Sequence, residues 1–335
     1  MNVEMPEKLP KTWPEKTLLI IKRASFWMIF LAALCAIVAA DDSCPAPEEL
    51  SPCTCDGEGL NCMGATSLAQ IKKAFSSKFK YGGVRSVWIQ GTPITRIPGD
   101  LFGEVKSQQF YIEVNNITDI DVNAFVGSRK ALRTLSFFGN KIENFNYRGL
   151  KIYENLSVLN LGRNKIKSIP DNAFESRSLY AIIFAQNEIS YIGKNAFTGL
   201  TSLGRLEIAL NSLVTLGDMS FAFKTHSESL QINLSANKIQ EVAASAFTGA
   251  SPYAVFISQN QLKSLDYAAF GGLVTRIAQK GGFLEVSGNP LTCRGCDYSW
   301  IVLNKAQLAS KLVGFTCQDG TRIERLTKSS IGCDN

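Results

Sequence analysis

The chain has 335 residues, of which 45% are hydrophobic, and it carries a formal net charge of +6. This length and apolar content are enough to bury a large core, and the length alone suggests about two domains. The positive charge is too small to indicate a nucleic-acid-binding protein, because such proteins usually carry a clustered basic face. We therefore expect no nucleic-acid partner.

Residues 1–40 have the pattern of a secretory signal peptide. Two basic residues precede an unbroken small or apolar run from Ala24 to Ala40, and the run ends in the small-residue pattern of a cleavage site before Asp41. The alternative is a retained signal anchor, because a run of 17 residues is at the lower limit for spanning a bilayer. No apolar stretch follows Cys333, so we expect a secreted, extracellular protein with no membrane attachment after cleavage.

Removing the signal peptide, with Cys35, leaves eight cysteines, an even number that suits the oxidising environment of a secreted protein. They are Cys44, Cys53, Cys55 and Cys62 near the start and Cys293, Cys296, Cys317 and Cys333 near the end. The long segment between the two groups contains none. This distribution predicts disulfides that close the two ends of an elongated molecule.

The segment after the first cysteine group predicts a short amphipathic helix. Thr66 or Ser67 is a candidate N-cap, apolar residues follow at helical spacing, and the pair Gly82-Gly83 ends the segment. The apolar residues are Leu68, Ile71, Phe75 and Phe79. We expect this helix to seal the first strand of the fold that follows.

Residues 84–291 form a tandem repeat with about nine copies of roughly 24 residues. The stretch LNLGRNKIKSIPDNAF shows the pattern around Asn164, with apolar residues five and three places before it and two and ten places after it. The aligned column at Asn164 is Thr92, Asn115, Asn140, Asn164, Asn187, Asn211, Asn237, Asn260 and Asn289. The column ten places later is Phe102, Phe125, Leu150, Phe174, Phe197, Phe221, Phe247 and Phe270.

The repeat predicts an α/β solenoid. The alternating apolar residues before each Asn indicate a short strand with its apolar side chains turned inward. One repeat cannot bury that face alone, so stacked repeats share a continuous core and their strands form one concave parallel sheet. The Phe column fills the wider convex side. Each Asn supplies two donors and an acceptor to buried backbone groups after the strand, so we interpret this column as a structural ladder.

This spacing resembles the extracellular leucine-rich repeat, with its horseshoe shape, and both cysteine groups resemble the terminal caps of that family. The resemblance implies the pairs Cys44–Cys55 and Cys53–Cys62 at one end, and Cys293–Cys317 and Cys296–Cys333 at the other. We therefore divide the chain into a signal peptide (1–40), an N-terminal cap (41–83), repeats (84–291) and a C-terminal cap (289–335).

The sequence offers no catalytic constellation. His226 is the only histidine, and its loop sequence KTHSES indicates a solvated residue. Taken alone, Cys293-x-x-Cys296 is compatible with a redox or zinc site, but neither histidine ligands nor a thioredoxin-like strand accompany it. Trp300 is expected to pack inside the C-terminal cap, with a binding role as the alternative. We expect neither an enzyme nor a bound metal or cofactor.

Three sequons, at Asn116, Asn155 and Asn233, are candidate N-glycosylation sites. The first two lie just outside the strands. Asn233 lies between two inward residues of a strand, so its side chain is expected on the concave face, where a glycan would obstruct part of that surface.

Function in a solenoid usually lies on the concave face. The central outward column there is Trp88, Tyr111, Ser136, Asn160, Ile183, Glu207, Asn233, Phe256 and Glu285. Trp88 and Tyr111 occupy adjacent strands, and exposed aromatic residues on a rigid sheet are typical anchors for a protein partner. With Phe138 and Arg163 they form our candidate site. The alternative is that the N-terminal cap covers both rings.

The chain also resembles an arthropod secreted family named for the non-catalytic subunit of Oplophorus luciferase. The resemblance covers the N-terminal cysteines, the helix after them, the stretch DLFGEVKSQQFYIEV and the ending TCQDGTRIERL. It implies a non-enzymatic chain that associates with another secreted protein and stabilises it. The alternatives are an innate-immune or developmental recognition module that binds a glycan or signalling ligand on the concave face, and a structural matrix protein.

Overall fold

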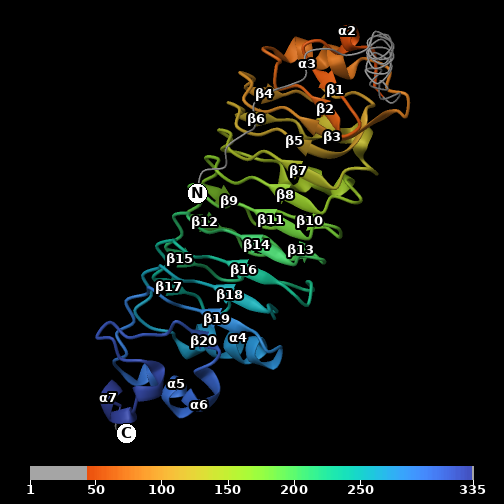
Figure 1. Ribbon diagram of the computed structural model, residues 1–335. Helices are drawn as coiled ribbons and strands as arrows, with labels where there is room; N and C mark the ends of the chain where they lie inside the picture. Colours follow the sequence, from red (N-terminus) through yellow and green to blue (C-terminus); the bar gives the residue numbers. More distant parts are fainter. Residues whose placement is uncertain (1–43, 334–335) are drawn as a thin grey trace, which may run out of the picture.

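The computed structural model describes residues 44–333, which form an elongated stack of repeats between two caps (Figure 1). The predicted signal peptide lies outside the described residues. One twelve-stranded sheet runs the length of the stack, in the order β1-β2-β3-β5-β7-β8-β11-β14-β16-β18-β19-β20. All neighbouring strands are parallel except β1 and β2. A leucine-rich-repeat fold with a long, mostly parallel sheet is therefore confirmed.

The sheet strands are short because each repeat contributes only its alternating segment. They are β1 (Thr54–Cys55), β2 (Gly59–Asn61), β3 (Gly83–Trp88), β5 (Lys106–Tyr111), β7 (Thr134–Ser136), β8 (Val158–Asn160), β11 (Ala181–Ile183), β14 (Arg205–Glu207), β16 (Gln231–Asn233), β18 (Ala254–Phe256), β19 (Phe283–Glu285) and β20 (Leu312–Val313). The predicted outward residues are register partners on successive strands, from Trp88 opposite Tyr111 to Phe256 opposite Glu285.

The other side of the stack consists of short strand pairs, 3₁₀ helices and one longer helix. The pairs are β4 (Arg96–Ile97) with β6 (Asp119–Ile120), β9 (Ser168–Ile169) with β12 (Tyr191–Ile192), β10 (Glu175–Ser176) with β13 (Gly199–Leu200), and β15 (Thr215–Leu216) with β17 (Glu241–Val242). The helices are η1 (Val122–Ser128), η2 (Tyr147–Ile152) and α4 (Tyr267–Gln279). The helix α4 in the last repeat is not predicted by the sequence pattern.

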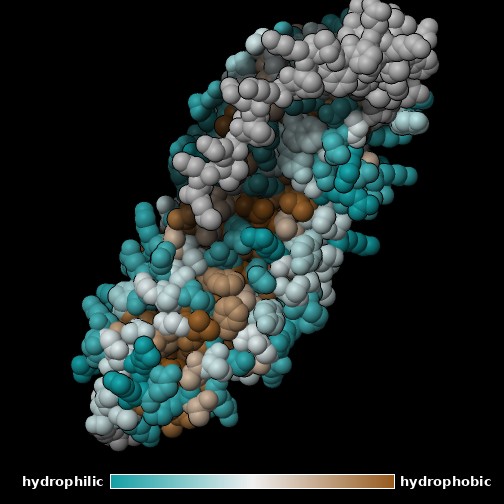
Figure 2. Space-filling model, in the orientation of Figure 1, coloured by the Kyte–Doolittle hydropathy of each residue, from teal (hydrophilic) through white to brown (hydrophobic). Residues whose placement is uncertain are grey.

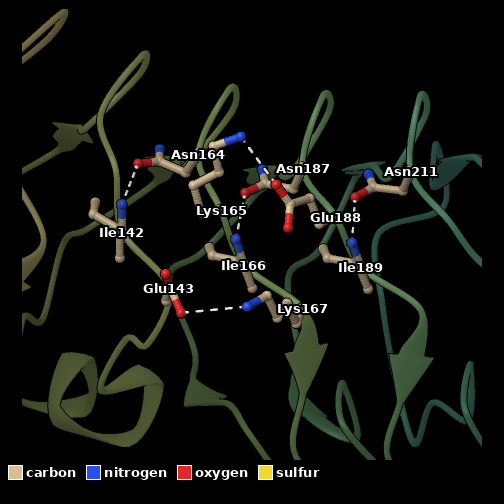
Figure 3. A network of polar contacts seen from close by, with 10 residues as sticks. All are labelled: Ile142, Glu143, Asn164, Lys165, Ile166, Lys167, Asn187, Glu188, Ile189 and Asn211. Carbon is tan, nitrogen blue, oxygen red and sulfur yellow. Dashed lines mark hydrogen bonds and ion pairs between the residues drawn. The ribbon is translucent and has the colours of Figure 1, made fainter.

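The Asn ladder is built as expected. Every member of the column, including Thr92, is buried. The amide nitrogen of Asn164 donates to the carbonyl oxygens of Phe137 at 2.9 Å and Leu161 at 3.1 Å, and its side-chain oxygen accepts from the backbone N–H of Ile142 at 3.0 Å. Figure 3 shows that Asn187 and Asn211 repeat this contact with Ile166 and Ile189. Each Asn therefore links its own turn to the preceding repeat.

A chain of aromatic contacts runs through the core from the N-terminal cap to the later repeats. Phe102 lies 5.1 Å from Phe125 between ring centroids, and Phe174 lies 5.9 Å from Phe197. Leu150 interrupts the column, and there Tyr147 of η2 supplies the ring, 5.0 Å from Phe174. The Tyr147 hydroxyl has no hydrogen-bond partner among the described residues, and burial raises its pKa well above the usual range.

Two disulfides hold each cap, and the structure makes the four pairs that the family resemblance implies. They are Cys44–Cys55, Cys53–Cys62, Cys293–Cys317 and Cys296–Cys333. The N-terminal cap contains α2 (Pro47–Leu50) and α3 (Leu68–Phe75). The helix α3 begins after Ser67, whose hydroxyl accepts from Gln70 N–H. The C-terminal cap contains η3 (Cys296–Tyr298), α5 (Ser299–Leu303), α6 (Lys305–Leu308), η4 (Ile323–Arg325) and α7 (Lys328–Ile331).

Candidate protein-binding face

The N-terminal part of the concave face carries six outward residues from three adjacent strand segments. In the register of β3, β5 and β7, Trp88, Tyr111 and Ser136 form one row across the strands. Two places further along each segment, Gln90, Glu113 and Phe138 form a second row, because outward side chains on a strand recur every second residue. We call these six residues the aromatic grid.

The Trp88 and Tyr111 rings are stacked, with centroids 6.2 Å apart and an angle of 11° between their planes. Both side chains are partly exposed, so the N-terminal cap as described does not bury them. Strand β2 pairs alongside β3, with Asn61 opposite Trp88, and β1 is the edge strand beyond it, so the sheet continues past Trp88 at this end. The Tyr111 hydroxyl donates to Gln109 Oε1 at 3.3 Å, which helps to fix the ring.

Glu113 is at the centre of the second row of the aromatic grid. Its carboxylate accepts from Gln90 Nε2 at 2.9 Å and from the Ser136 hydroxyl. Ser136 is fully buried beneath its neighbours, although its side chain is on the outward side. Each of these bonds joins neighbouring strands, so the polar network holds the rows in register.

The other two candidate residues differ in their setting. Phe138 is partly exposed beside Gly139. Arg163 is exposed on the turn after β8, with a positive φ of 55°. The residue before each ladder Asn or Thr has the same left-handed backbone, including Val114 and Gly288. Arg163 therefore lies at the border of the grid, on a turn that the fold itself requires.

The C-terminal half of the face has a separate aromatic group. The rings of Phe256 and Phe283 meet edge to face, with centroids 5.5 Å apart. Figure 2 shows hydrophobic side chains gathered along a strip over the middle strands of the sheet, interrupted by hydrophilic ones. Between the two aromatic groups, Glu207 forms an ion pair with Arg205 at 2.9 Å and accepts from Asn233 Nδ2 at 2.9 Å.

The three sequons have different surroundings. Asn116 is exposed in the turn after β5. Asn155 is exposed before β8, and its Nδ2 donates to the carbonyl oxygen of Lys130 at 2.8 Å. Asn233 lies on the concave face, as expected, but its side chain is partly buried and bonded to Glu207.

The expectation that His226 is solvated is wrong. The residue is partly buried, and its ring packs edge-on against Phe223 with centroids 5.6 Å apart. Its Nδ1 lies 2.8 Å from the Ser227 carbonyl oxygen, and its Nε2 accepts from the backbone N–H of Ser251 at 3.0 Å. These two contacts require the neutral ring with the proton on Nδ1. His226 therefore links two repeats, a role that its loop sequence does not reveal.

Trp300 is partly buried and joins the C-terminal cap to the last repeat. Its indole N–H donates to the Leu265 carbonyl oxygen at 3.0 Å, and its ring lies 5.8 Å from that of Tyr267 on α4. Both contacts are structural ones. Among residues 44–333 there is no helix long and apolar enough to cross a bilayer.

Comparisons with known proteins agree with this architecture. A model of the "BspA type Leucine rich repeat region (6 copies)" matches residues 140–276. A chain from the octameric complex of Latrophilin 3, Unc5D and FLRT2 has the same fold, with a TM-score of 0.54, 20% identity, and coverage of 84% of this chain and 99% of that one.

Two relatives span different shares of their own length. The Oplophorus-luciferin 2-monooxygenase non-catalytic subunit of Oplophorus gracilirostris is 26% identical over 85% of this chain and 86% of its own. The human leucine-rich repeats and immunoglobulin-like domains protein 1 is 26% identical over 67% of this chain but only 19% of its own length. The chain is thus a leucine-rich-repeat protein with a disulfide-bonded cap at each end, similar over most of its length to the Oplophorus non-catalytic subunit.

Proposed function

We propose that the protein is a secreted, non-enzymatic scaffold that binds another extracellular protein through the aromatic grid and stabilises it. The observation that carries this proposal is the partly exposed Trp88–Tyr111 stack on a rigid sheet. Large aromatic residues of this kind dominate the binding free energy of many protein interfaces. The similarity to a protein named as a non-catalytic subunit supports an associating role without catalysis.

Rigidity favours this face as a binding surface. The backbone under the grid is held by the β3–β5–β7 ladder, by Asn115 and Asn140 below it, and by the Glu113 network above it. A preorganised surface loses little conformational entropy when it binds. Glycans at Asn116 and Asn155 fit the proposal, because both lie outside the strands of the face.

The proposal includes the division of the chain into a cleaved signal peptide, an N-terminal cap (41–83), repeats (84–291) and a C-terminal cap (289–335). It also takes all three sequons as glycosylation sites, with Asn233 toward the C-terminal half of the face, away from Trp88.

The test is affinity capture from the native extracellular fluid, followed by mass spectrometry. The parent protein is expected to retain a specific extracellular protein, and Trp88→Ala with Tyr111→Ala is expected to lose it. Aromatic anchors each contribute about 2 kcal/mol or more at an interface. Glu285→Ala, at the far end of the sheet, is the control. Normal capture by the double variant, with unchanged circular dichroism, would refute the assignment of the site.

A further inference from the structure

A groove at the C-terminal end of the stack lies between α4 and the helices α5 and α6 of the cap (Figure 1). Its volume is about 500 Å³, within the range of about 300–1,000 Å³ that is usual for small-molecule sites. Val274 of α4 and Leu308 of α6 line it with buried apolar side chains. The aromatic grid is at the opposite end of the stack, so this groove is a separate candidate site.

Two aromatic rings, one from each side of the groove, lie close together. Tyr267 on α4 and Trp300 on α5 have ring centroids 5.8 Å apart. The Trp300 indole N–H donates to the Leu265 carbonyl oxygen, so this ring is held in place by the protein itself. Tyr267 is 64% exposed. The pair therefore offers aromatic surface to a ligand in the groove.

Gly271 allows the Tyr267 ring to lie against α4. A Cβ at position 271 would be 2.4 Å from both Cδ2 and Cε2 of that ring, so the ring occupies the space that a side chain would need. Gly272 has a different setting, because a Cβ there would meet the Nη1 atom of Arg276 at 3.2 Å. A larger residue at 271 would therefore displace the ring, whereas one at 272 would not.

The polar groups of the groove are neutral. Among the described residues, none that lines the groove carries a charge. Gln279 and Gln307 are exposed, and neither side-chain amide has a hydrogen-bond partner within residues 44–333. Each amide offers two N–H donors and one carbonyl acceptor. Asn304 donates from Nδ2 to the Trp300 carbonyl oxygen at 2.7 Å, and its side-chain oxygen remains an acceptor.

This combination matches a neutral saccharide. A β-linked pyranose with equatorial hydroxyls has apolar C–H faces that pack on aromatic rings, and a rim of hydroxyls that donate and accept hydrogen bonds. An ionised ligand fits less well, because the groove has no charge to pair with it and burying an unpaired charge is costly. We propose that the groove binds a neutral β-linked pyranoside, with the two aromatic rings packing on the sugar and the two glutamine amides bonding its hydroxyls. This site goes beyond the proposed function and does not depend on it.

The test follows Trp88 and Trp300, the two tryptophans of residues 44–333, by ¹⁹F NMR. The purified protein is labelled with 5-fluorotryptophan, and each resonance is identified by its loss in Trp88→Phe or Trp300→Phe. Two neutral disaccharides are titrated. Methyl β-cellobioside has hydroxyls alone, as in a plain β-glucan, whereas N,N′-diacetylchitobiose carries acetamido groups, as in the core of N-linked glycans. The tighter ligand of the two indicates which source supplies the sugar.

A neutral disaccharide is expected to shift the Trp300 resonance saturably and to leave the Trp88 resonance unchanged. Cellobiouronic acid, a β-linked disaccharide of similar shape with one carboxylate, should bind about tenfold more weakly or less. Tyr267→Ala and Gly271→Ala should each weaken binding of the neutral sugar about tenfold or more, since one removes the ring and the other displaces it. Gly272→Ala is the matched control and should bind as the parent does. Both glycine substitutions favour the helix, so a loss confined to Gly271→Ala does not come from unfolding of α4.

Failure of either neutral disaccharide to shift Trp300 saturably, equal binding of the acid, or unchanged affinity in Tyr267→Ala or Gly271→Ala would each overturn the proposal. Capture of an extracellular protein that Tyr267→Ala abolishes, with no saccharide shift in the parent, would assign the groove to a protein partner instead. The Trp88/Tyr111 double variant tests the aromatic grid and should bind the saccharide as the parent does, so the two proposals fail separately.

Discussion

Replacing Asn164 by Leu tests the ladder at a single position. The substitution removes four hydrogen bonds. Asn164 donates in three of them, and each of these three carbonyl acceptors keeps another donor. Phe137 O retains Asn140 Nδ2 at 3.0 Å, Leu161 O retains Asn187 Nδ2 at 2.9 Å, and Gly162 O retains the Gly139 N–H at 3.0 Å. Only the Ile142 N–H loses its sole partner.

One orphaned buried donor costs about 1–3 kcal/mol. We therefore expect Asn164→Leu to lower the free energy of unfolding by that amount, measured as a shift of the urea midpoint at constant slope. Hydrogen exchange of the Ile142 amide should accelerate with it. Asn144→Leu, at an exposed position, should change neither quantity. An unchanged midpoint together with unchanged Ile142 exchange would refute the ladder as described.

Three further predictions follow from buried polar groups and from the caps. Tyr147→Phe should raise the free energy of unfolding by about 1 kcal/mol, because it removes a buried hydroxyl that has no partner among residues 44–333. Tyr153→Phe should lower it by a similar amount, because that hydroxyl donates to the Val122 carbonyl oxygen. The opposite order in urea titrations would contradict both assignments. His226→Ala should cost about 1–3 kcal/mol by orphaning the Ser251 N–H, whereas Lys224→Ala on the same loop should be neutral in thermal unfolding. Replacing Cys296 and Cys333 by Ser removes a disulfide of sequence separation 37 and should lower the free energy of unfolding by about 4 kcal/mol. Replacing Cys53 and Cys62, at separation 9, should lower it by about 2.6 kcal/mol. Equal losses in denaturant titrations would argue against the loop-entropy account.

The main features of the fold were predictable because they repeat. A single Asn among apolar residues is ambiguous, but Asn115 to Asn289 recur with apolar residues at fixed offsets, and only a stacked structure satisfies all of them together. The outward positions follow from the same alignment, since side chains alternate along a strand. The row of Trp88, Tyr111 and Ser136 was predictable on this ground.

Contacts that depend on one repeat's departure from the pattern were not predictable. The acceptor role of His226 depends on Ser251 in the following repeat, and no local pattern links the two. Tyr147 supplies the ring of the aromatic core in the repeat where the Phe column has Leu150. The long step before Asn289 indicates extra chain, but Gly271 and Gly272 argue against a helix there, since each costs about 1 kcal/mol.

The helix α4 nevertheless forms, and its packing explains why. Asp266 caps it by accepting from the Ala268 N–H at 3.2 Å, and Leu273, Val274 and Ile277 are buried against the stack. A Cβ at Gly271 would lie 2.4 Å from the ring of Tyr267, so a larger residue there would displace that exposed ring. Tertiary burial thus outweighs the low helix propensity of glycine.

The difference between inward and outward residues of the sheet explains why the aromatic grid is the strongest functional candidate. Inward residues such as Phe110 and the ladder Asn115 are fixed by the stack, so their identity says little about a partner. The side chains of Trp88 and Tyr111 are outside the core, because they are partly exposed on the outward side of the sheet. The partly exposed Trp88–Tyr111 stack leaves apolar area in contact with water that the fold itself does not require. Binding a partner at this face would remove that area from water.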